Sequence, residues 1–285
     1  MFPLTSKLLY HSPIKGLRNF MRAAEEFNKY CLGSYKRYLA SYDPQTRHDL
    51  IARMVNERTA LTKQGQSIPR HVTERGIVDE LSNLVFAGTD TTGNTLTYLF
   101  YDLARHPEWQ TRLHKEVVDA VGEQASPDYS LIQGLPALEA VVQEIFRFRP
   151  ASPDGLIRVV PKGGAVVDSV FVPAGTLVSS QALSTQRDPT IFPDPDSFNP
   201  QRWLDAEGTE NIDLMREQML LFGKGARSCL GRRLATMEIK CALAAIARRY
   251  KVEIGSAETD DDMQMIDHFV LIPKGQRCVL RLTRL

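Results

Sequence analysis

The stretch FGKGARSCLG, residues 222–231, carries the strongest local signal in the chain. Gly223 and Gly225 permit unusual backbone angles, and Cys229 stands immediately before a predicted helix. Backbone N–H groups and the positive end of the helix dipole favour a negative sulfur at that position, and Arg227 adds a nearby cation. The stretch therefore indicates a thiolate ligand, although a single cysteine taken alone is more often a small buried apolar residue.

The composition around this stretch is that of an ordinary folded protein. The chain has 285 residues, of which 43% are hydrophobic and 24% charged, and this excludes disordered and fibrous classes. Because 35 Lys and Arg residues oppose 34 Asp and Glu residues, the net charge is only +1, and we expect no nucleic-acid partner. No Gly/Ser-rich linker or charge block divides the chain, which indicates one domain over residues 1–285.

The cysteines and the start of the chain exclude further classes. No two of the four cysteines lie within four residues of each other, so zinc pairs and redox CxxC motifs are absent; they are Cys31, Cys229, Cys241 and Cys278. Charged residues and prolines interrupt the opening stretch MFPLTSKLLYHSPIKGLR before a signal core can form, and no run of 18 apolar residues occurs. We expect no membrane anchor within this chain.

The residue pattern indicates a mainly α fold with a small antiparallel β region. Helices are predicted over residues 17–42, 47–64, about 73–105, 107–121, about 137–148 and about 231–250. From 156 to 183 the pattern changes to short β-branched runs separated by Gly and Pro, which is typical of a small antiparallel sheet.

Two later segments carry further predictions. Residues 186–203, QRDPTIFPDPDSFNPQRW, contain four prolines and are expected to form a loop without helix or central strand, packed down by its aromatic residues. The stretch HFVLIP at 268–273, the turn Lys274-Gly275 and the stretch QRCVLRL at 276–282 predict a closing hairpin.

Five positions of 222–231 fit the pattern FxxGxRxCxG, which resembles the haem-binding loop of the cytochrome P-450 family: Phe222, Gly225, Arg227, Cys229 and Gly231. Three more matches follow the family's order, namely AGTDTT at 87–92, ExxR at Glu144 and Arg147, and FNPQRW at 198–203. The resemblance covers nearly the whole chain. It implies a cytochrome P-450 fold, the C-terminal portion of a eukaryotic microsomal-type member, and a haem-thiolate monooxygenase that uses dioxygen to oxidise a small apolar organic substrate.

The resemblance also implies a cofactor, haem b (iron protoporphyrin IX), with the Cys229 thiolate as axial ligand that donates electron density to iron. Arg158 and Arg227 resemble the arginines that bind haem propionates, where a planar guanidinium matches a carboxylate. For Arg158 an ordinary surface strand position is the alternative.

The AGTDTT stretch is poorly suited to a plain core helix, because each glycine weakens a helix by about 1 kcal/mol relative to alanine. The resemblance implies an oxygen-binding groove there, with Ala87 and Gly88 against the haem. Thr91 then hydrogen-bonds dioxygen or its water, and Asp90 delivers protons towards it. The alternative is that Thr91 only caps a kink in the helix.

Glu144 and Arg147 share one helical face, but an i,i+3 ion pair alone contributes only about 0.2–0.5 kcal/mol. The resemblance implies that Arg202 joins them in a buried network that fixes the proline-rich loop under the haem, a structural role.

The implied electron donor is an NADPH-dependent flavoprotein reductase. We expect a basic patch to bind this reductase, and the alternative is that the patch is an ordinary solvated helix face. The residues of the patch are Lys224, Arg232, Arg233 and Lys240. An apolar substrate pocket, or ordinary core, is expected at Phe86, Ala87, Leu156 and Phe269.

The chain departs from the family at its start. The anchor, the opening strands and the WxxxR helix are missing, and Trp109, followed by Arg112 after three residues, does not replace that helix. We therefore expect a partial domain, either an incomplete chain or a natural short form, that binds haem poorly by itself. A full-length member is expected at the cytosolic face of the endoplasmic reticulum membrane; for this chain the cytoplasm is the alternative.

Two other functions stay open, a non-catalytic haem-binding fragment and a reductase-independent isomerase or dehydratase that rearranges a peroxide. The missing N-terminal part of the family's domain favours the non-catalytic haem-binding fragment. Asp90 and Thr91 favour the monooxygenase, because a supplied peroxide needs no proton delivery to dioxygen.

Overall fold

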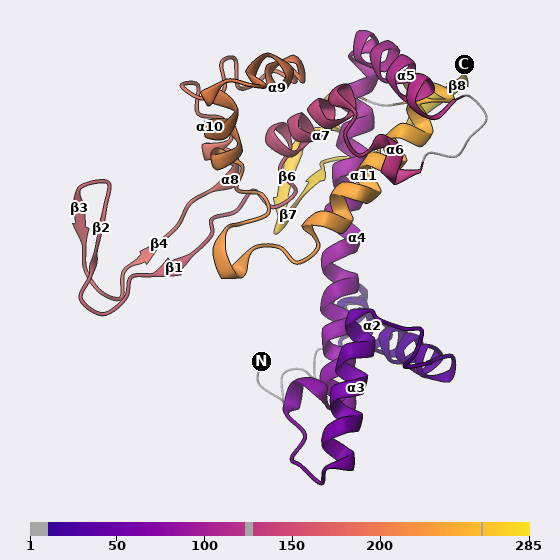
Figure 1. Cartoon of the computed structure of the whole chain (residues 1–285), viewed down its shortest axis with the longest axis vertical. Helices are drawn as coiled ribbons and strands as arrows, with labels where there is room; N and C mark the ends of the chain where they lie inside the picture. Colours follow the sequence, from indigo (N-terminus) through magenta and orange to yellow (C-terminus); the bar gives the residue numbers. More distant parts are fainter. Residues whose placement is uncertain (1–10, 123–127, 258) are drawn as a thin grey trace. The chain divides into compact units, whose positions relative to one another are not determined.

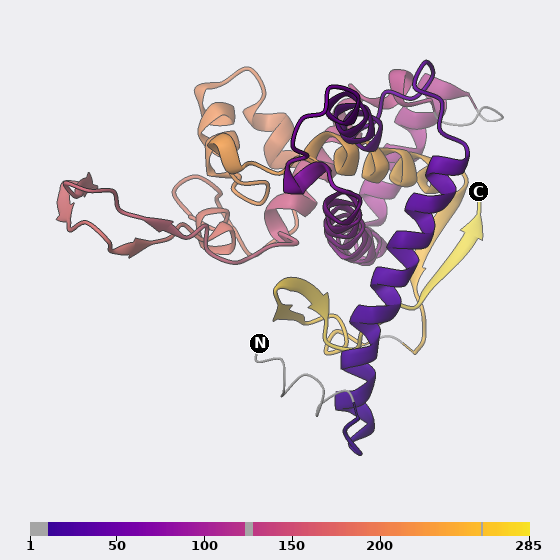
Figure 2. The same ribbon diagram turned by 90° about the horizontal axis from the view of Figure 1, so that it is seen from below.

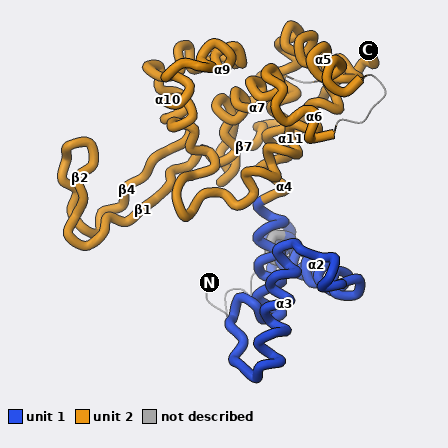
Figure 3. The backbone as a smooth tube through the Cα atoms, in the orientation of Figure 1, with its two compact units in different colours: residues 1–87 blue, residues 88–285 orange. Residues whose placement is uncertain are grey.

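The computed structural model describes residues 11–122, 128–257 and 259–285. The chain divides into two compact units, residues 1–87 and 88–285 (Figure 3), and each is described by itself. The division falls within helix α4 (Glu74–Ala104), which is within one residue of the predicted range at each end. Within the described residues, no helix combines the length and the apolar character that crossing a membrane requires.

Unit 1 is helical. It contains α2 (Lys15–Ala40), α3 (Leu50–Lys63), a 3₁₀ turn η1 (Arg70–Val72) and the first turns of α4 (Figure 1). Asp49 ends the link between α2 and α3: its carboxylate caps α3 by accepting from the Ala52 N–H at 2.9 Å, and it also accepts from the Tyr38 hydroxyl at 2.9 Å. The buried apolar core of the unit joins residues of all three helices, namely Cys31, Tyr35, Val55, Ile77 and Val78.

The turn η1 lies directly against the first turn of α4, where the sequence has Gly76. The hydroxyl of Thr73 caps this turn by accepting from the Gly76 N–H at 3.0 Å. A Cβ at Gly76 would collide with the Arg70 carbonyl and lie 2.7 Å from the His71 carbonyl oxygen. These are backbone atoms of the neighbouring turn, so the close approach requires glycine.

We predict that Gly76→Ala lowers the free energy of unfolding of unit 1 by about 1–3 kcal/mol, because the overpacking outweighs the helix propensity of alanine. Gly16→Ala in α2 is the matched control, since a Cβ there meets nothing within 4 Å. That control should be neutral or stabilising by up to about 1 kcal/mol. Urea unfolding of both variants followed by circular dichroism measures the difference, and equal effects would contradict the packing described.

Helices also form the core of unit 2. Helix α11 (Arg232–Ala247) packs on α5 (Pro107–Val121), α6 (Tyr129–Ile132) and α7 (Pro136–Phe148), and these helices stay side by side in the turned view (Figure 2). Pro107 and Pro136 stand at the first helical positions, where the missing N–H costs nothing. Helix α7 is the most deeply buried of the four, and its buried side chains include the charged pair Glu144 and Arg147.

Short antiparallel strands make up the β region. Strand β1 (Arg158–Val159) pairs with β4 (Leu177–Val178), and β2 (Ala165–Val167) pairs with β3 (Val170–Val172), as an arm that extends from the helices of unit 2 (Figure 1). The two residues of the β2–β3 turn, Asp168 and Ser169, both have positive φ, which matches the twist of a two-residue hairpin. The predicted fold class, mainly α with a small antiparallel β region, is confirmed.

The predicted closing hairpin is wrong. Strand β7 (Val270–Pro273) pairs with β6 (Met265–His268), whereas β8 (Leu280–Arg284) pairs with β5 (Tyr250–Ile254). The turn of the real hairpin is Phe269, whose φ is +75° and whose N–H donates to the Asp267 carboxylate at 2.9 Å. A phenylalanine with positive φ is uncommon, so the sequence gives no sign of a turn there.

The proline-rich segment lies between α8 (Ala182–Thr185) and α10 (Glu210–Gln218). The prediction that 186–203 contains no helix is wrong for its last three residues, because α9 (Gln201–Ala206) begins directly after Pro200. A proline ahead of a helix removes only an N–H that would have no helical partner. This short helix carries Arg202 and Trp203 into the protein interior.

Candidate functional site

The buried carboxylate of Glu144 collects five N–H donors. Its side chain is 0% exposed, and such a charge is stable only when it is paired and fully hydrogen-bonded. The donors are Arg147 Nε (2.9 Å) and Nη2 (2.8 Å), Arg202 Nε (3.3 Å), Trp203 Nε1 (2.9 Å) and the Asn199 backbone N–H (2.8 Å). One carboxylate on α7 thus fixes two side chains of α9 and the backbone just before it.

The two arginines of this network also bind the proline-rich segment. Several of its carbonyl groups have no partner in a helix or strand, and buried carbonyls need donors. Arg147 donates to the carbonyls of Gln186 (3.0 Å), Pro195 (2.8 Å) and Ser197 (2.9 Å), and Arg202 donates to those of Pro193 (2.6 Å) and Asp194 (3.1 Å). The segment is therefore held by guanidinium groups rather than by regular secondary structure.

The structure brings together the three residues that the resemblance assigns to this network, Glu144, Arg147 and Arg202. Sequence reasoning missed two further members. Trp203 follows Arg202 in the FNPQRW stretch, and this adjacency was a usable signal. Gln186 gave no signal, because its partners lie about 35 to 40 residues away in the sequence.

The cysteine-containing loop is closed by backbone hydrogen bonds. The Cys229 N–H donates to the Phe222 carbonyl at 2.7 Å, so the two ends of the loop 222–229 are joined. Gly223 and Gly225 have φ of +64° and +70°, which the tight path requires. The Cys229 side chain is an exposed free thiol three residues before α11 begins.

Phe222 anchors the loop on α7. Its ring meets that of Phe146 edge to face, with centroids 5.1 Å apart, and the Arg232 guanidinium lies over it at 5.8 Å. Phe146 directly precedes Arg147 in α7. The loop and the buried network are therefore attached to the same turn of one helix.

The donor set of this loop suits a haem. A single cysteine is a sufficient protein ligand where the group itself supplies the other in-plane ligands, as porphyrin nitrogens do. The Cys229 sulfur is exposed, and the exposed Arg227 is available to a carboxylate. Two of the other thiols fit less well: Cys31 is buried in unit 1, and burial, followed by the charge of Asp128, raises the pKa of the Cys241 thiol.

Arg158, the second arginine expected at the propionates, lies exposed on β1, where its Nη1 donates to the Ile157 carbonyl at 2.8 Å. No contact joins it to the loop 222–231 among the interactions described for residues 88–122, 128–257 and 259–285. Its expected role thus depends on the bound group.

The AGTDTT stretch lies in α4 and has an open surface. A Cβ added at Gly88 or Gly93 would meet nothing within 4 Å. Hydroxyls one turn later donate to helix carbonyls, Thr95 to Thr91 at 2.8 Å and Thr97 to Gly93 at 2.9 Å, as expected of a threonine-rich helix. Ala87 is exposed and Thr91 half-buried on the same helix.

Asp90 is exposed and lines a hollow of about 330 Å³ with Asn94 and Thr97 of α4 and with residues 272, 273 and 276–278. Cys229 is not among its lining residues. The structure thus places Asp90 beside the connection between β7 and β8 rather than in one pocket with the cysteine.

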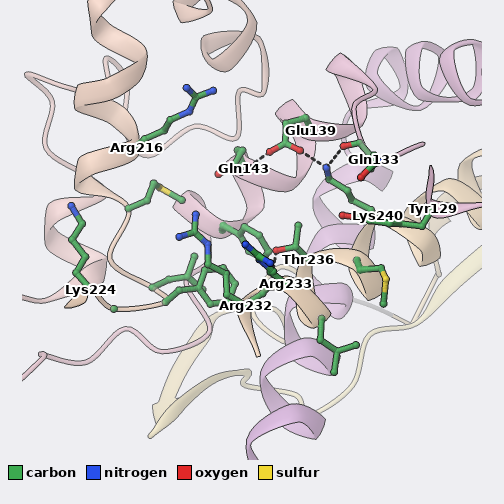
Figure 4. Close-up of a pocket in the computed structure, with 17 residues that line it drawn as sticks. Tyr129, Gln133, Glu139, Gln143, Arg216, Lys224, Arg232, Arg233, Thr236 and Lys240 are labelled. Atoms are coloured by element: carbon green, nitrogen blue, oxygen red, sulfur yellow. Dashed lines mark hydrogen bonds and ion pairs between the residues drawn. The ribbon is translucent and has the colours of Figure 1, made fainter. Parts of the chain in front are cut away.

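A larger hollow of about 760 Å³ lies beside the cysteine loop, between α7, α10 and α11 (Figure 4). Five cationic side chains line it, and four of them are exposed, namely Arg216, Lys224, Arg232 and Arg233. Lys240 lines the hollow from its buried side: it is 4% exposed, forms an ion pair with Glu139 and donates to the Gln133 carbonyl at 2.5 Å. Its predicted place in a basic patch is wrong, and Arg216, contributed by α10, was not predicted.

Comparison with known proteins identifies the family. A sequence model of the cytochrome P-450 family matches residues 1–279. The chain is 32% identical to the cytochrome P-450 monooxygenase tazI of Aspergillus terreus over 282 residues, 98% of this chain and 55% of that protein. It is 30% identical to cytochrome P-450 1A1 of Opsanus tau, over 95% of this chain and 51% of the relative.

Over a shorter region the chain is 43% identical to the mitochondrial 25-hydroxyvitamin D-1 alpha hydroxylase of Mus musculus, across 64% of this chain and 35% of that enzyme. The chain spans about a third to just over half the length of the curated relatives it matches. It belongs to the cytochrome P-450 family.

We predict that Glu144→Gln lowers the free energy of unfolding of unit 2 by about 3–5 kcal/mol, because two guanidinium groups then lose a buried counter-charge. Glu207→Gln is the matched control, since Glu207 is exposed and pairs with the exposed Arg216 at 3.4 Å. Its effect should stay below about 1 kcal/mol. Guanidinium chloride unfolding measures both, and a Glu144→Gln effect as small as the control's would contradict the buried charge network.

Proposed function

We propose that Cys229 holds a haem b iron as its axial ligand and that the chain belongs to the catalytic part of a monooxygenase. One observation carries the proposal: the exposed Cys229 thiol lies on a loop whose ends are joined at Phe222 and which is anchored on the buried helix α7. When bound, haem supplies the redox chemistry that activates dioxygen and transfers one oxygen atom to an organic substrate.

The side chains around Cys229 have binding roles in this proposal. Arg227 and Arg158 pair with the haem propionates as planar guanidinium groups. Phe222, Gly225 and Gly231 shape the loop that presents the sulfur, in line with the anchoring of the Phe222 ring on Phe146 and the positive φ of Gly225. Ala87 and Gly88 let a flat ring approach the backbone of α4, in line with the open space at Gly88.

Thr91 and Asp90 handle protons in the proposed reaction. Asp90 is exposed and can exchange protons with solvent, whereas Thr91, one position later, is half-buried. A hydroxyl that both donates and accepts can pass a proton from the wet side of the helix to the protected side. The proposed route therefore runs from solvent through Asp90 to Thr91.

The cationic side chains beside the loop, Arg216, Lys224, Arg232 and Arg233, support a negatively charged electron donor. We propose an NADPH-dependent flavoprotein reductase whose acidic face docks there, at the cytosolic face of the endoplasmic reticulum membrane. The relative named as mitochondrial makes the mitochondrion the alternative location. For the substrate we propose a small apolar organic molecule, supported by the exposed ring of Phe269 and by the half-buried Leu156.

We predict that Cys229→Ala abolishes the thiolate-type spectrum of the reduced carbon monoxide complex in a haem-loaded preparation of the protein. Cys241→Ala is the matched control, because Cys241 is a half-buried thiol of α11 that packs on the apolar core. The control should keep the wild-type spectrum. A thiolate spectrum that survives in Cys229→Ala would show that another residue is the ligand.

We predict that Thr91→Ala retains haem and oxygen binding but lowers the yield of product per electron, with peroxide formed instead, because the positioned proton donor is lost. The rate of product formation should fall about 10²–10⁴-fold, the usual contribution of such a donor. Thr97→Ala, which removes another helix hydroxyl of α4, should leave the yield unchanged. The assay compares product, peroxide and NADPH consumed. An unchanged yield in Thr91→Ala would reduce Thr91 to a residue that caps a kink in the helix. Rearrangement of an organic peroxide to an isomer or a dehydrated product without reductase would identify an isomerase or dehydratase.

A further inference from the structure

Gln186 lies directly after α8, and its side chain is 0% exposed. Its amide makes four hydrogen bonds, which is the full capacity of that group. The Nε2 group donates to the carbonyls of Phe146 (2.9 Å) and Arg147 (3.1 Å), and Oε1 accepts from the N–H groups of Leu220 (3.0 Å) and Leu221 (3.1 Å). One buried side chain thus joins two segments that are far apart in sequence.

On one side Gln186 completes the end of α7. The last four carbonyls of a helix have no partner within it. Gln186 satisfies two of them, and the neighbouring Arg187 satisfies that of Phe148 through Nη2 at 2.9 Å. The Gln186 backbone carbonyl in turn accepts from the Arg147 side chain at 3.0 Å. Gln186 therefore both donates to and accepts from Arg147, a member of the Glu144 network.

On the other side Gln186 holds the start of the cysteine loop. Leu220 and Leu221 are the two residues directly before Phe222. The Leu220 carbonyl accepts from Gly223 at 2.8 Å, and the Phe222 carbonyl accepts from Cys229 at 2.7 Å. A continuous series of hydrogen bonds and peptide links therefore runs from α7 through Gln186 to the backbone of Cys229.

We propose that Gln186 is a positioning residue for the Cys229 ligand: it fixes the stem of the cysteine loop to the end of α7 and so sets where the sulfur stands. This inference rests on the proposed function. The contact of Phe222 with Phe146 is apolar and tolerates sliding, whereas four directional hydrogen bonds do not. Without the glutamine, two N–H groups of the stem lose their acceptor and the loop loses its register on the helix.

The chain offers a matched control for this bridge. Gln110 of α5 also spans two segments: its Nε2 donates to the carbonyls of Leu103 (2.8 Å) and Val252 (2.9 Å), and its Oε1 accepts from the Val252 N–H (2.8 Å). Its bonds join helices α4 and α5 to strand β5 and do not touch residues 220–229. Replacing either glutamine by leucine leaves backbone groups unpaired, but only Gln186→Leu does so at the loop.

The experiment compares Gln186→Leu and Gln110→Leu with the wild type in haem-loaded protein. Two quantities are measured, hydrogen exchange of the Leu220 and Leu221 amides and the fraction of iron with a thiolate-type carbon monoxide spectrum. In Gln186→Leu we expect exchange about tenfold faster, the effect of losing one hydrogen bond, and a lower thiolate fraction. Gln110→Leu should lose comparable thermal stability and keep both quantities at wild-type values.

A full thiolate fraction in Gln186→Leu would overturn the positioning role, and so would an equal loss of the thiolate fraction in Gln186→Leu and Gln110→Leu. A wild-type protein without a thiolate spectrum would instead contradict the proposed function, so the two failures are distinguishable. Gln186→Glu covers the case in which Gln186→Leu does not fold. It keeps the acceptor for Leu220 and Leu221, so exchange of those amides should stay near the wild-type rate. It turns a carboxylate oxygen towards the carbonyls of α7, so the thiolate fraction should fall, and a full thiolate fraction would overturn the positioning role.

Discussion

The arrangement of unit 2 depends on one buried negative charge. The Glu144 carboxylate is stable in the interior only while its five donors are all in place, since an incompletely satisfied buried ion costs several kcal/mol. Those donors come from α7, from the backbone before α9 and from α9 itself. The three segments therefore cannot move independently, and the proline-rich chain between them keeps one path although it has almost no regular secondary structure.

This constraint extends from the buried network to the exposed cysteine. Arg147 binds the Gln186 carbonyl, the Gln186 side chain binds the backbone before Phe222, and Phe222 closes the loop at Cys229. The residues of the charged network are buried, whereas the Cys229 thiol and the cationic side chains beside it are exposed. The buried network therefore fixes the backbone, and the exposed residues that it holds in place are the ones that can contact other molecules.

Local signals in the sequence predict the parts of this structure that local interactions determine. Pro107 and Pro136 mark helix starts, and the glycines of residues 222–231 indicate a tight loop, because each acts through its own backbone. The partners of Glu144 were predicted only through the family resemblance, since an i,i+3 pair alone is uninformative.

The remaining features arise from tertiary contacts that no local pattern encodes. The strand pattern of β7 and β8 predicts strands but not their pairing, which the turn at Phe269 decides. Lys240 has the sequence appearance of a surface cation, yet it is buried against Glu139 and Gln133. In the sequence Gln186 is an ordinary polar residue, because its partners at the end of α7 and at residues 220–221 come together only in the folded protein.

We propose that the buried network holds Cys229 where it ligates haem iron. X-ray absorption at the iron edge of haem-loaded protein tests it most directly, because sulfur neighbours are distinguished from nitrogen and oxygen. We expect one sulfur neighbour per iron in the wild type and a smaller average number in folded Glu144→Gln protein. An equal sulfur contribution in both proteins, or none in the wild type, would contradict it.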